Sequence, residues 1–236
     1  METTFFKANS RGKTKTDWLD SFHTFSFGDY HDPKRVHFGV LRVINDDIVA
    51  PSTGFDPHSH QNMEIITIPL EGSLFHQDHL GNRSTIQKGE VQIMSAGTGI
   101  MHSEHNPSST ENVNLFQVWI YPQEKQIMPR YGQKAFLENQ RINQLQCVVS
   151  PDERGGSLWI NQDAFIYLSK MDKGTKLDYK LNNPDHGVLA MLISGSAQVE
   201  SQKLESRDAI GISGVKQISI HAAENAELVL FEIPMK

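Results

Sequence analysis

The stretches GFDPHSHQNMEIITIPLEGSLFHQDHLGN (residues 54–82) and KGEVQIMSAGTGIMHSEHNPS (residues 88–108) decide the fold. Each carries one pair of side chains suited to a metal, His58 with His60 and His102 with Glu104. Alternate residues of an extended strand point to the same face, so each pair projects its two side chains together. Turn glycines flank the apolar runs in both stretches. The pattern predicts a small antiparallel barrel with a metal site in its mouth.

The two pairs together predict one metal site with four ligands, His58, His60, His102 and Glu104. Imidazole nitrogens suit iron, nickel, copper and zinc, and a set with a single carboxylate leaves coordination positions open for a substrate or dioxygen. This composition is typical of a catalytic site more than of a closed structural one. The alternative is that the first pair lies on a solvated strand face and the second is an unrelated loop pair, because an isolated His-x-His motif is weak evidence.

Composition limits the classes of protein. A chain of 236 residues holds one large domain or two modest ones, and 38% hydrophobic with 21% charged residues is typical of a globular protein. The net charge of -6, without a dense Lys/Arg run, argues against direct nucleic-acid binding. No signal peptide and no run of about 18 apolar residues is recognisable, so we expect no membrane segment and a cytoplasmic location. The single cysteine, Cys147, is expected to be a buried, inert thiol.

Strand signals continue through the chain and predict an all-β protein. Short β-branched or aromatic runs recur at 38–43, 64–70, 90–94 and 115–121, and again at 145–150, 164–169, 188–193, 209–212 and 227–233. The Pro- and Gly-containing stretch 123–141 is expected to lack regular structure, and we place the domain boundary there, giving domains 1–130 and 131–236. A faint repeat links Ile68–Ser73 with Met191–Ser196, which two copies of one barrel would explain.

The second copy has no ligand pair of its own. Only His186 and His221 stand in the corresponding regions, and Ala223 occupies the position that would match Glu104. A lone histidine on a strand is more often hydrogen-bonded or exposed than a ligand. The sequence therefore predicts one metal per chain, in the N-terminal barrel.

The same stretches resemble the two cupin motifs in the form used by the pirin family. WLDSFHTFSF (residues 18–27) and FGVLRVINDD (residues 38–47) are similar to that family's opening segments. The resemblance implies two tandem cupin barrels, each a double-stranded β-helix or jelly roll. It also implies that the N-terminal barrel alone binds the metal and takes its carboxylate from the second motif, as Glu104. Glu64 is the rival, because many cupins use a glutamate at that place.

The resemblance also implies an activity, that of a quercetin 2,3-dioxygenase. Such an enzyme opens the ring of a flavonol such as quercetin with O2 and releases carbon monoxide. Glu104 would act as ligand and as the base that takes the flavonol proton, which makes it the expected catalytic residue. One divalent metal is implied, with Fe(II) first, and zinc, nickel, cobalt, copper or manganese are alternatives because such sites follow the divalent affinity series.

The substrate pocket is harder to predict than the metal ligands. Phe55, Met63, His76 and Phe116 are candidates for its wall, and each is equally consistent with core packing. His76 is also a candidate for orienting a ligand or the substrate from behind. His105 directly follows Glu104 and should point to the opposite face.

Two other functions stay open at this point. The protein could be a non-enzymatic, metal- and redox-dependent regulator that acts through protein partners, as some pirins are. It could also be an idle metabolite binder on the same barrel, which the complete ligand set disfavours. Since two fused barrels bury the face by which single-domain cupins dimerise, we expect a monomer.

Overall fold

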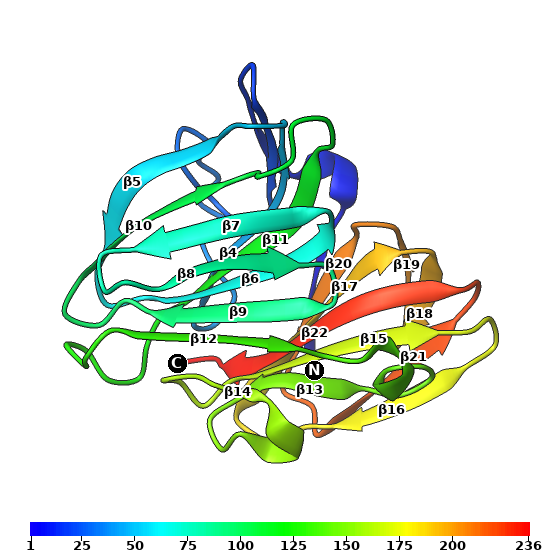
Figure 1. Ribbon diagram of the computed structural model, residues 1–236. Helices are drawn as coiled ribbons and strands as arrows, with labels where there is room; N and C mark the ends of the chain where they lie inside the picture. Colours follow the sequence, from blue (N-terminus) through cyan, green and yellow to red (C-terminus); the bar gives the residue numbers. More distant parts are fainter.

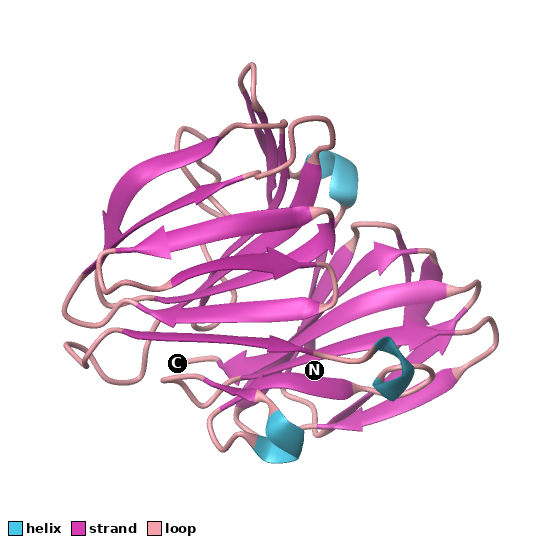
Figure 2. Ribbon diagram, viewed as in Figure 1, coloured by secondary structure: helices cyan, strands magenta, loops and turns pink.

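The computed structural model describes residues 1–236 as two β-barrels, each built from one seven-stranded and one four-stranded sheet. Figure 2 shows that helix is confined to three short turns, η1 (Ala8–Ser10), η2 (Glu138–Gln140) and η3 (Arg154–Gly156). No helix in the structure combines the length and the apolar character needed to cross a membrane. The predicted all-β fold with two tandem barrels is confirmed.

The first barrel contains both motifs. Its seven-stranded sheet has the order β12-β9-β6-β11-β4-β3-β2, with β2 (Gly12–Lys15), β3 (Leu19–His23), β4 (Leu41–Val49), β6 (Glu64–Glu71), β9 (Glu90–Ser95), β11 (Val113–Ile120) and β12 (Arg130–Ala135). Its four-stranded sheet has the order β5-β10-β7-β8, with β5 (Gly54–His60), β7 (Ser73–Asp78), β8 (Arg83–Gln87) and β10 (Ile100–His105). All of these strand pairs are antiparallel.

The second barrel repeats this arrangement. Its seven-stranded sheet has the order β1-β20-β17-β22-β15-β13-β14, with β1 (Glu2–Phe6), β13 (Gln146–Ser150), β14 (Leu158–Trp159), β15 (Phe165–Met171), β17 (His186–Ser194), β20 (Ala209–Ser213) and β22 (Ala226–Pro234). Its four-stranded sheet has the order β16-β21-β18-β19, with β16 (Lys176–Lys180), β18 (Ser196–Val199), β19 (Gln202–Glu205) and β21 (Gln217–Ala222).

The sequence repeat between Ile68–Ser73 and Met191–Ser196 corresponds to the same strand-to-strand turn in each barrel. Gly72 joins β6 to β7 with φ +71°, and Gly195 joins β17 to β18 with φ +83°. A side chain at Gly195 would also meet the backbone oxygen of Asn225 at 2.0 Å. Both positions therefore need glycine, for its left-handed backbone and, at Gly195, for its lack of a Cβ.

In each barrel, one edge strand of the seven-stranded sheet comes from the other half of the chain. β1, at the N-terminus, pairs with β20 of the second barrel, and β12 pairs with β9 of the first. The expectation that residues 123–141 lack regular structure is wrong, because β12 fits there as an edge strand on which Pro129 precedes the first paired residue. We keep 1–130 and 131–236 as a proposed division into folding units, with β1 and β12 exchanged across it.

The main hydrophobic core lies between the two seven-stranded sheets. It joins side chains from one face of the first barrel, such as Ile44 and Phe116, with Leu189 and Phe231 of the second. On β11 the alternation is clear, since Phe116 and Val118 point to this core while Gln117 and Trp119 line the barrel interior. The core between the barrels thus fixes the outer faces of the strands that carry the interior residues.

The two barrel interiors differ in character. The second is filled by a cluster of 19 buried apolar residues that includes Leu204, Ile218 and Leu230. The first has only two clusters of four, around Leu115 and Met94, with a polar pocket between its sheets. A barrel interior that is left polar and open is available for ligands, so the first barrel is the place to look for chemistry.

Candidate metal centre

The two predicted ligand pairs lie on neighbouring strands. β5 and β10 pair antiparallel with His58 directly opposite His102 and Ile100 opposite His60. A bulge then shifts the register, so that Glu104 faces Phe55 rather than Asp56. Bulges beside functional sites commonly re-aim side chains, and this one separates Glu104 from the histidine pair of β5.

Three imidazoles meet at one point. The ring centroids of His58, His60 and His102 lie 4.9, 4.4 and 5.0 Å apart, and one nitrogen from each comes within 4.8 Å of the others. An ion bound about 2.0–2.1 Å from each nitrogen would draw the three rings closer together. The three histidines therefore fit a single divalent ion.

The protonation of these rings also suits a metal. His58 donates from Nδ1 to the Asp56 carbonyl at 2.8 Å, which leaves its Nε2 as a free lone pair. His102 Nε2 is buried without any hydrogen-bond partner. Burial lowers the pKa of His60 to about 4, helped by His58, and burial with neighbouring histidines lowers the pKa of His102 to about 2. Both rings are thus neutral at pH 7, as ligands must be.

Glu104 is buried beside the histidines but is held by a different partner. Gln117 Nε2 donates to both of its carboxyl oxygens, at 3.3 and 3.1 Å. Its carboxylate forms a second cluster with His102 and His76, so the predicted four-ligand set is divided into two groups that share His102. Burial raises the pKa of Glu104 to about 7, with the hydrogen bond from Gln117 opposing it. Its role as fourth ligand and as base stays a prediction.

His76 lies on the far side of His102 from the other two histidines of the metal cluster. It is fully buried on β7, opposite Glu104 on β10, and its ring packs at a tilt against Tyr131 with centroids 5.0 Å apart. Its Nδ1 is 3.5 Å from His102 Nδ1 and its Nε2 is 3.5 Å from Asp78 Oδ2. These contacts are long, and the role of His76 in orienting His102 stays a prediction.

The rival carboxylate, Glu64, lies outside both clusters. It is fully buried on β6, where its Oε2 accepts from Ser95 Oγ at 2.8 Å and from the Asn161 N–H at 3.2 Å. Its Oε1 has no partner. Glu64 therefore ties the first barrel to the second instead of facing the histidines.

This burial makes a testable contribution to stability. Burial raises the pKa of Glu64 from 4.5 to about 6, so between these values the folded state binds more protons than the unfolded state and stability falls as the pH rises. Relative to Glu64→Gln, the wild type should lose about 2 kcal/mol of unfolding free energy between pH 4 and pH 7. Urea unfolding at several pH values measures this. Parallel pH profiles for the two proteins would contradict it.

A pocket of about 260 Å³ opens in front of the histidines. Aromatic and aliphatic side chains form part of its wall, and polar ones form the rest: Thr14, Leu19, Ser21, His23, Phe27, Asn45, Asp47, Phe55, His58, His60, Ile65, His102, Glu104, Gln117 and Trp119. Of the four predicted wall residues only Phe55 lines it. Phe116 points away into the main core, Met63 packs beside Met94, and His76 lies behind His102.

The polar part of this wall is what sequence reasoning missed. His23 has no partner at ligand spacing in the sequence, yet it faces the pocket with Asn45 and Asp47. One signal was available: in the strand LRVINDDIV, two polar residues occupy the face that Leu41, Val43 and Val49 otherwise make apolar. Polar residues on a buried strand face are uncommon unless they serve a ligand or a network.

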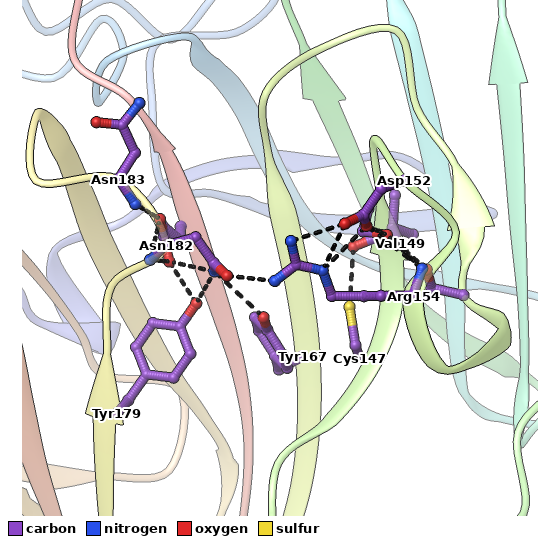
Figure 3. A network of polar contacts seen from close by, with 11 residues as sticks. Cys147, Val149, Asp152, Arg154, Tyr167, Tyr179, Asn182 and Asn183 are labelled. Carbon is purple, nitrogen blue, oxygen red and sulfur yellow. Dashed lines mark hydrogen bonds and ion pairs between the residues drawn. The ribbon is translucent and has the colours of Figure 1, made fainter.

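The second barrel uses its polar residues for hydrogen bonding alone. His186 Nδ1 donates to Glu232 Oε1 at 2.9 Å, and His221 belongs to no metal-like cluster. Figure 3 shows Asn182 between Tyr179 and Arg154, and Cys147 beside Val149. Cys147 Sγ lies 3.5 Å from the Val149 carbonyl oxygen. Burial raises the pKa of the Cys147 thiol, which fits an inert side chain.

Both halves of the chain are similar to known proteins. Residues 5–120 match the family model Pirin, and residues 147–233 match the model of the quercetinase C-terminal cupin domain. A quercetin 2,3-dioxygenase of Escherichia coli K12 is 44% identical over 97% of each chain. A pirin-like protein of Caulobacter vibrioides is 39% identical over 91% of this chain and 92% of its own.

A solved structure with the same fold holds a metal. The crystal structure of bacterial pirin YhhW from E. coli in complex with nickel(II) aligns with a TM-score of 0.94 over 99% of each chain, at 43% identity. Identity at this level over nearly the whole length shows common ancestry as well as common fold. By its sequence, its two cupin barrels and its relatives, the chain belongs to the pirin family.

Proposed function

We propose that this chain is a metal-dependent quercetin 2,3-dioxygenase that opens the flavonol ring with O2 and releases carbon monoxide. The observation that carries the proposal is the cluster of His58, His60 and His102 at one side of a 260 Å³ pocket. Relatives named quercetin 2,3-dioxygenase at 44% identity support it. Pockets that combine aromatic walls with a few convergent polar groups are typical of small-molecule sites.

The histidines would hold one divalent ion, with Glu104 beside His102. The ion would stabilise the flavonol as an anion and so favour its reaction with dioxygen. Phe27, Phe55 and Trp119 offer apolar surface against which a flat polycyclic substrate packs and from which it excludes water. These residues bind and position the substrate without taking part in proton transfer.

Proton transfer falls to Glu104 in this proposal. Its carboxylate is aimed at the pocket and held by Gln117, which Thr67 Oγ1 in turn contacts at 3.1 Å. A carboxyl group whose pKa lies near 7 exchanges protons readily at neutral pH, so it is suited to accept the flavonol 3-hydroxyl proton at one of its Oε atoms. Glu104 would thus serve as the general base.

We propose Fe(II) as the ion used in the cell. A mixed nitrogen and carboxylate site binds several divalent ions and availability decides which one is present, as the nickel(II) in the E. coli pirin structure illustrates for that protein. Metal content measured after reconstitution with each ion, together with turnover, would rank them.

The test is reconstitution of metal-free protein with ferrous iron under nitrogen, followed by quercetin and O2. The wild type should consume quercetin and release carbon monoxide, and a His58→Ala/His60→Ala variant should be at least about 100-fold slower because two ligands are gone. A His31→Ala/His37→Ala variant, which removes two exposed histidines outside the pocket, is the matched control. Stoichiometric metal without flavonol consumption would refute the enzyme and favour the regulatory function through protein partners.

A further inference from the structure

The wall formed by β3 and β4 is built to present polar atoms to the pocket. Asn45 and Asp47 stand two residues apart on the interior face of β4, each about 4% exposed. Opposite them on β3 lie His23, in register with Asn45, and Ser21, in register with Asp47. Four polar side chains in two adjacent rows are costly in a barrel interior unless each has a partner.

The first row holds Asn45 in a fixed orientation. His23 Nδ1 donates to Asn45 Oδ1 at 2.8 Å, and His23 Nε2 contacts Thr14 Oγ1 at 2.8 Å. Since the amide oxygen must accept, His23 carries its proton on Nδ1 and its Nε2 accepts from the threonine hydroxyl. The Asn45 oxygen is therefore used, and its Nδ2 amino group is left as a donor.

The second row holds Asp47 in the same way. Ser21 Oγ donates to Asp47 Oδ1, and no other side chain bonds the carboxyl group. Neither Asp47 Oδ2 nor Asn45 Nδ2 has a partner in the protein, and neither is among its fully enclosed unpartnered polar atoms. Both residues line the pocket, so one free acceptor and one free donor face it side by side.

A ligand that satisfies this wall needs two neighbouring groups, one that donates to Asp47 and one that accepts from Asn45. Alternate strand residues have Cα atoms about 6.5–7 Å apart, and their side chains can converge on groups a few ångströms apart. Two adjacent phenolic hydroxyls meet this need, because each hydroxyl both donates and accepts. Phe27 and Trp119, which line the same pocket, suit the flat ring that carries them.

We propose that Asn45 and Asp47 recognise the adjacent hydroxyls of an ortho-dihydroxyphenyl ring, so that the preferred substrates are flavonols with a catechol ring. The inference rests on the proposed function, because it takes the flavonol's 3-hydroxyl and 4-carbonyl edge to be at the histidines. β4 belongs to the sheet that faces β5 and β10, so one substrate can span the pocket from the histidines to this wall. Asn45 and Asp47 would be specificity-determining residues and not catalytic ones.

The experiment is equilibrium binding under nitrogen to the nickel(II)-loaded protein, so that no turnover interferes. Three flavonols share the metal-binding edge and differ in the second ring: quercetin has two adjacent hydroxyls, kaempferol has one, and galangin has none. The wild type should bind quercetin about 10- to 100-fold more tightly than galangin, as expected for two additional hydrogen bonds. Kaempferol should fall between them.

Two near-isosteric variants test the wall directly. Asp47→Asn and Asn45→Leu should each weaken quercetin binding about 10-fold or more and change galangin binding less than about 2-fold. Asp178→Asn, an exposed charge removal on β16, should behave as wild type. Bound nickel and the thermal midpoint of each variant show whether it is folded and loaded.

The outcomes separate this inference from the proposed function. If the wild type binds all three flavonols equally, or if the variants weaken all three equally, the catechol preference is refuted while the flavonol site stands. If the nickel-loaded wild type binds none of them, the proposed function itself fails. If Asp47→Asn and Asn45→Leu leave the ratio of the quercetin and galangin affinities unchanged, the preference comes from elsewhere in the pocket and the assignment to these two residues is wrong.

Discussion

Replacing His102 with leucine is expected to abolish stoichiometric metal binding while leaving the metal-free protein as stable as the wild type or more stable. His102 belongs to both candidate metal clusters, so its loss breaks either ligand set. In the metal-free protein its Nε2 is a buried polar atom without a partner, which is unfavourable. Leucine has a similar volume and no polar atom, so it removes that penalty without leaving a large cavity.

Two thermal unfolding curves of each protein, with and without nickel(II), measure both parts of this expectation. At a metal concentration 100 times the dissociation constant the wild type should gain about 2.7 kcal/mol of stability, and His102→Leu should gain none. His221→Leu removes a histidine from β21 of the second barrel and should keep the full gain. A His102→Leu protein that binds one metal per chain, or that loses several kcal/mol without metal, would show that the histidine is structural.

The ligand pairs could be predicted because their signal is local. In His58-Ser59-His60 and in His102-Ser103-Glu104 a period of two places both side chains on one face of a strand, and burial on β10 alternates as expected, with Met101 and His105 exposed. The strands around them were found for the same reason, since apolar alternation reports which face is buried. A metal cluster on two adjacent strands is therefore readable from the sequence.

The pocket could not be predicted. Its wall depends on which residues of each strand face the barrel interior and which face the core between the barrels. Phe116 is aromatic and near Gln117, but odd and even residues of β11 face different spaces, and only the packing of the second barrel makes the face of Phe116 a core. The bulge on β5 likewise has no clear sequence signal, and it decides that Glu104 faces Phe55 and bonds Gln117. Long-range packing and register thus set the pocket.

The largest loss of stability is expected from Asp46→Ala, at the junction between the barrels. Asp46 Oδ2 accepts from Arg11 Nη1 at 3.1 Å and from Arg207 Nε at 2.8 Å, and its Oδ1 accepts from Asn114 Nδ2 at 2.9 Å. The side chains of Arg11 and Asp46 are only 6% and 7% exposed. Removing the carboxylate leaves two guanidinium groups without their anion, one of them nearly buried, which typically costs about 3–5 kcal/mol.

The position of Arg207 makes this ion pair a link between the barrels. Arg207 lies in the turn before β20 with φ +69°, a strained backbone for a residue with a side chain, and its guanidinium also bonds Asn114 Oδ1 at 2.9 Å and lies over the Phe116 ring at 5.3 Å. Without the Asp46 carboxylate, this turn loses its ion pair with β4. The two barrels should then unfold in less closely coupled steps, because cooperativity between domains depends on such contacts.

Urea unfolding followed by tryptophan fluorescence and circular dichroism tests the link, since Trp18 and Trp119 belong to the first barrel's part of the chain and Trp159 to the second. Asp46→Ala should lower the urea midpoint of unfolding strongly. The transitions followed by fluorescence and by circular dichroism should then no longer coincide. Glu138→Ala, which breaks the exposed 2.7 Å pair with Lys170, should change the unfolding free energy by less than about 1 kcal/mol. Equal effects of the two substitutions would mean that Asp46 is no more important than a surface ion pair, and that the apolar core alone holds the barrels together.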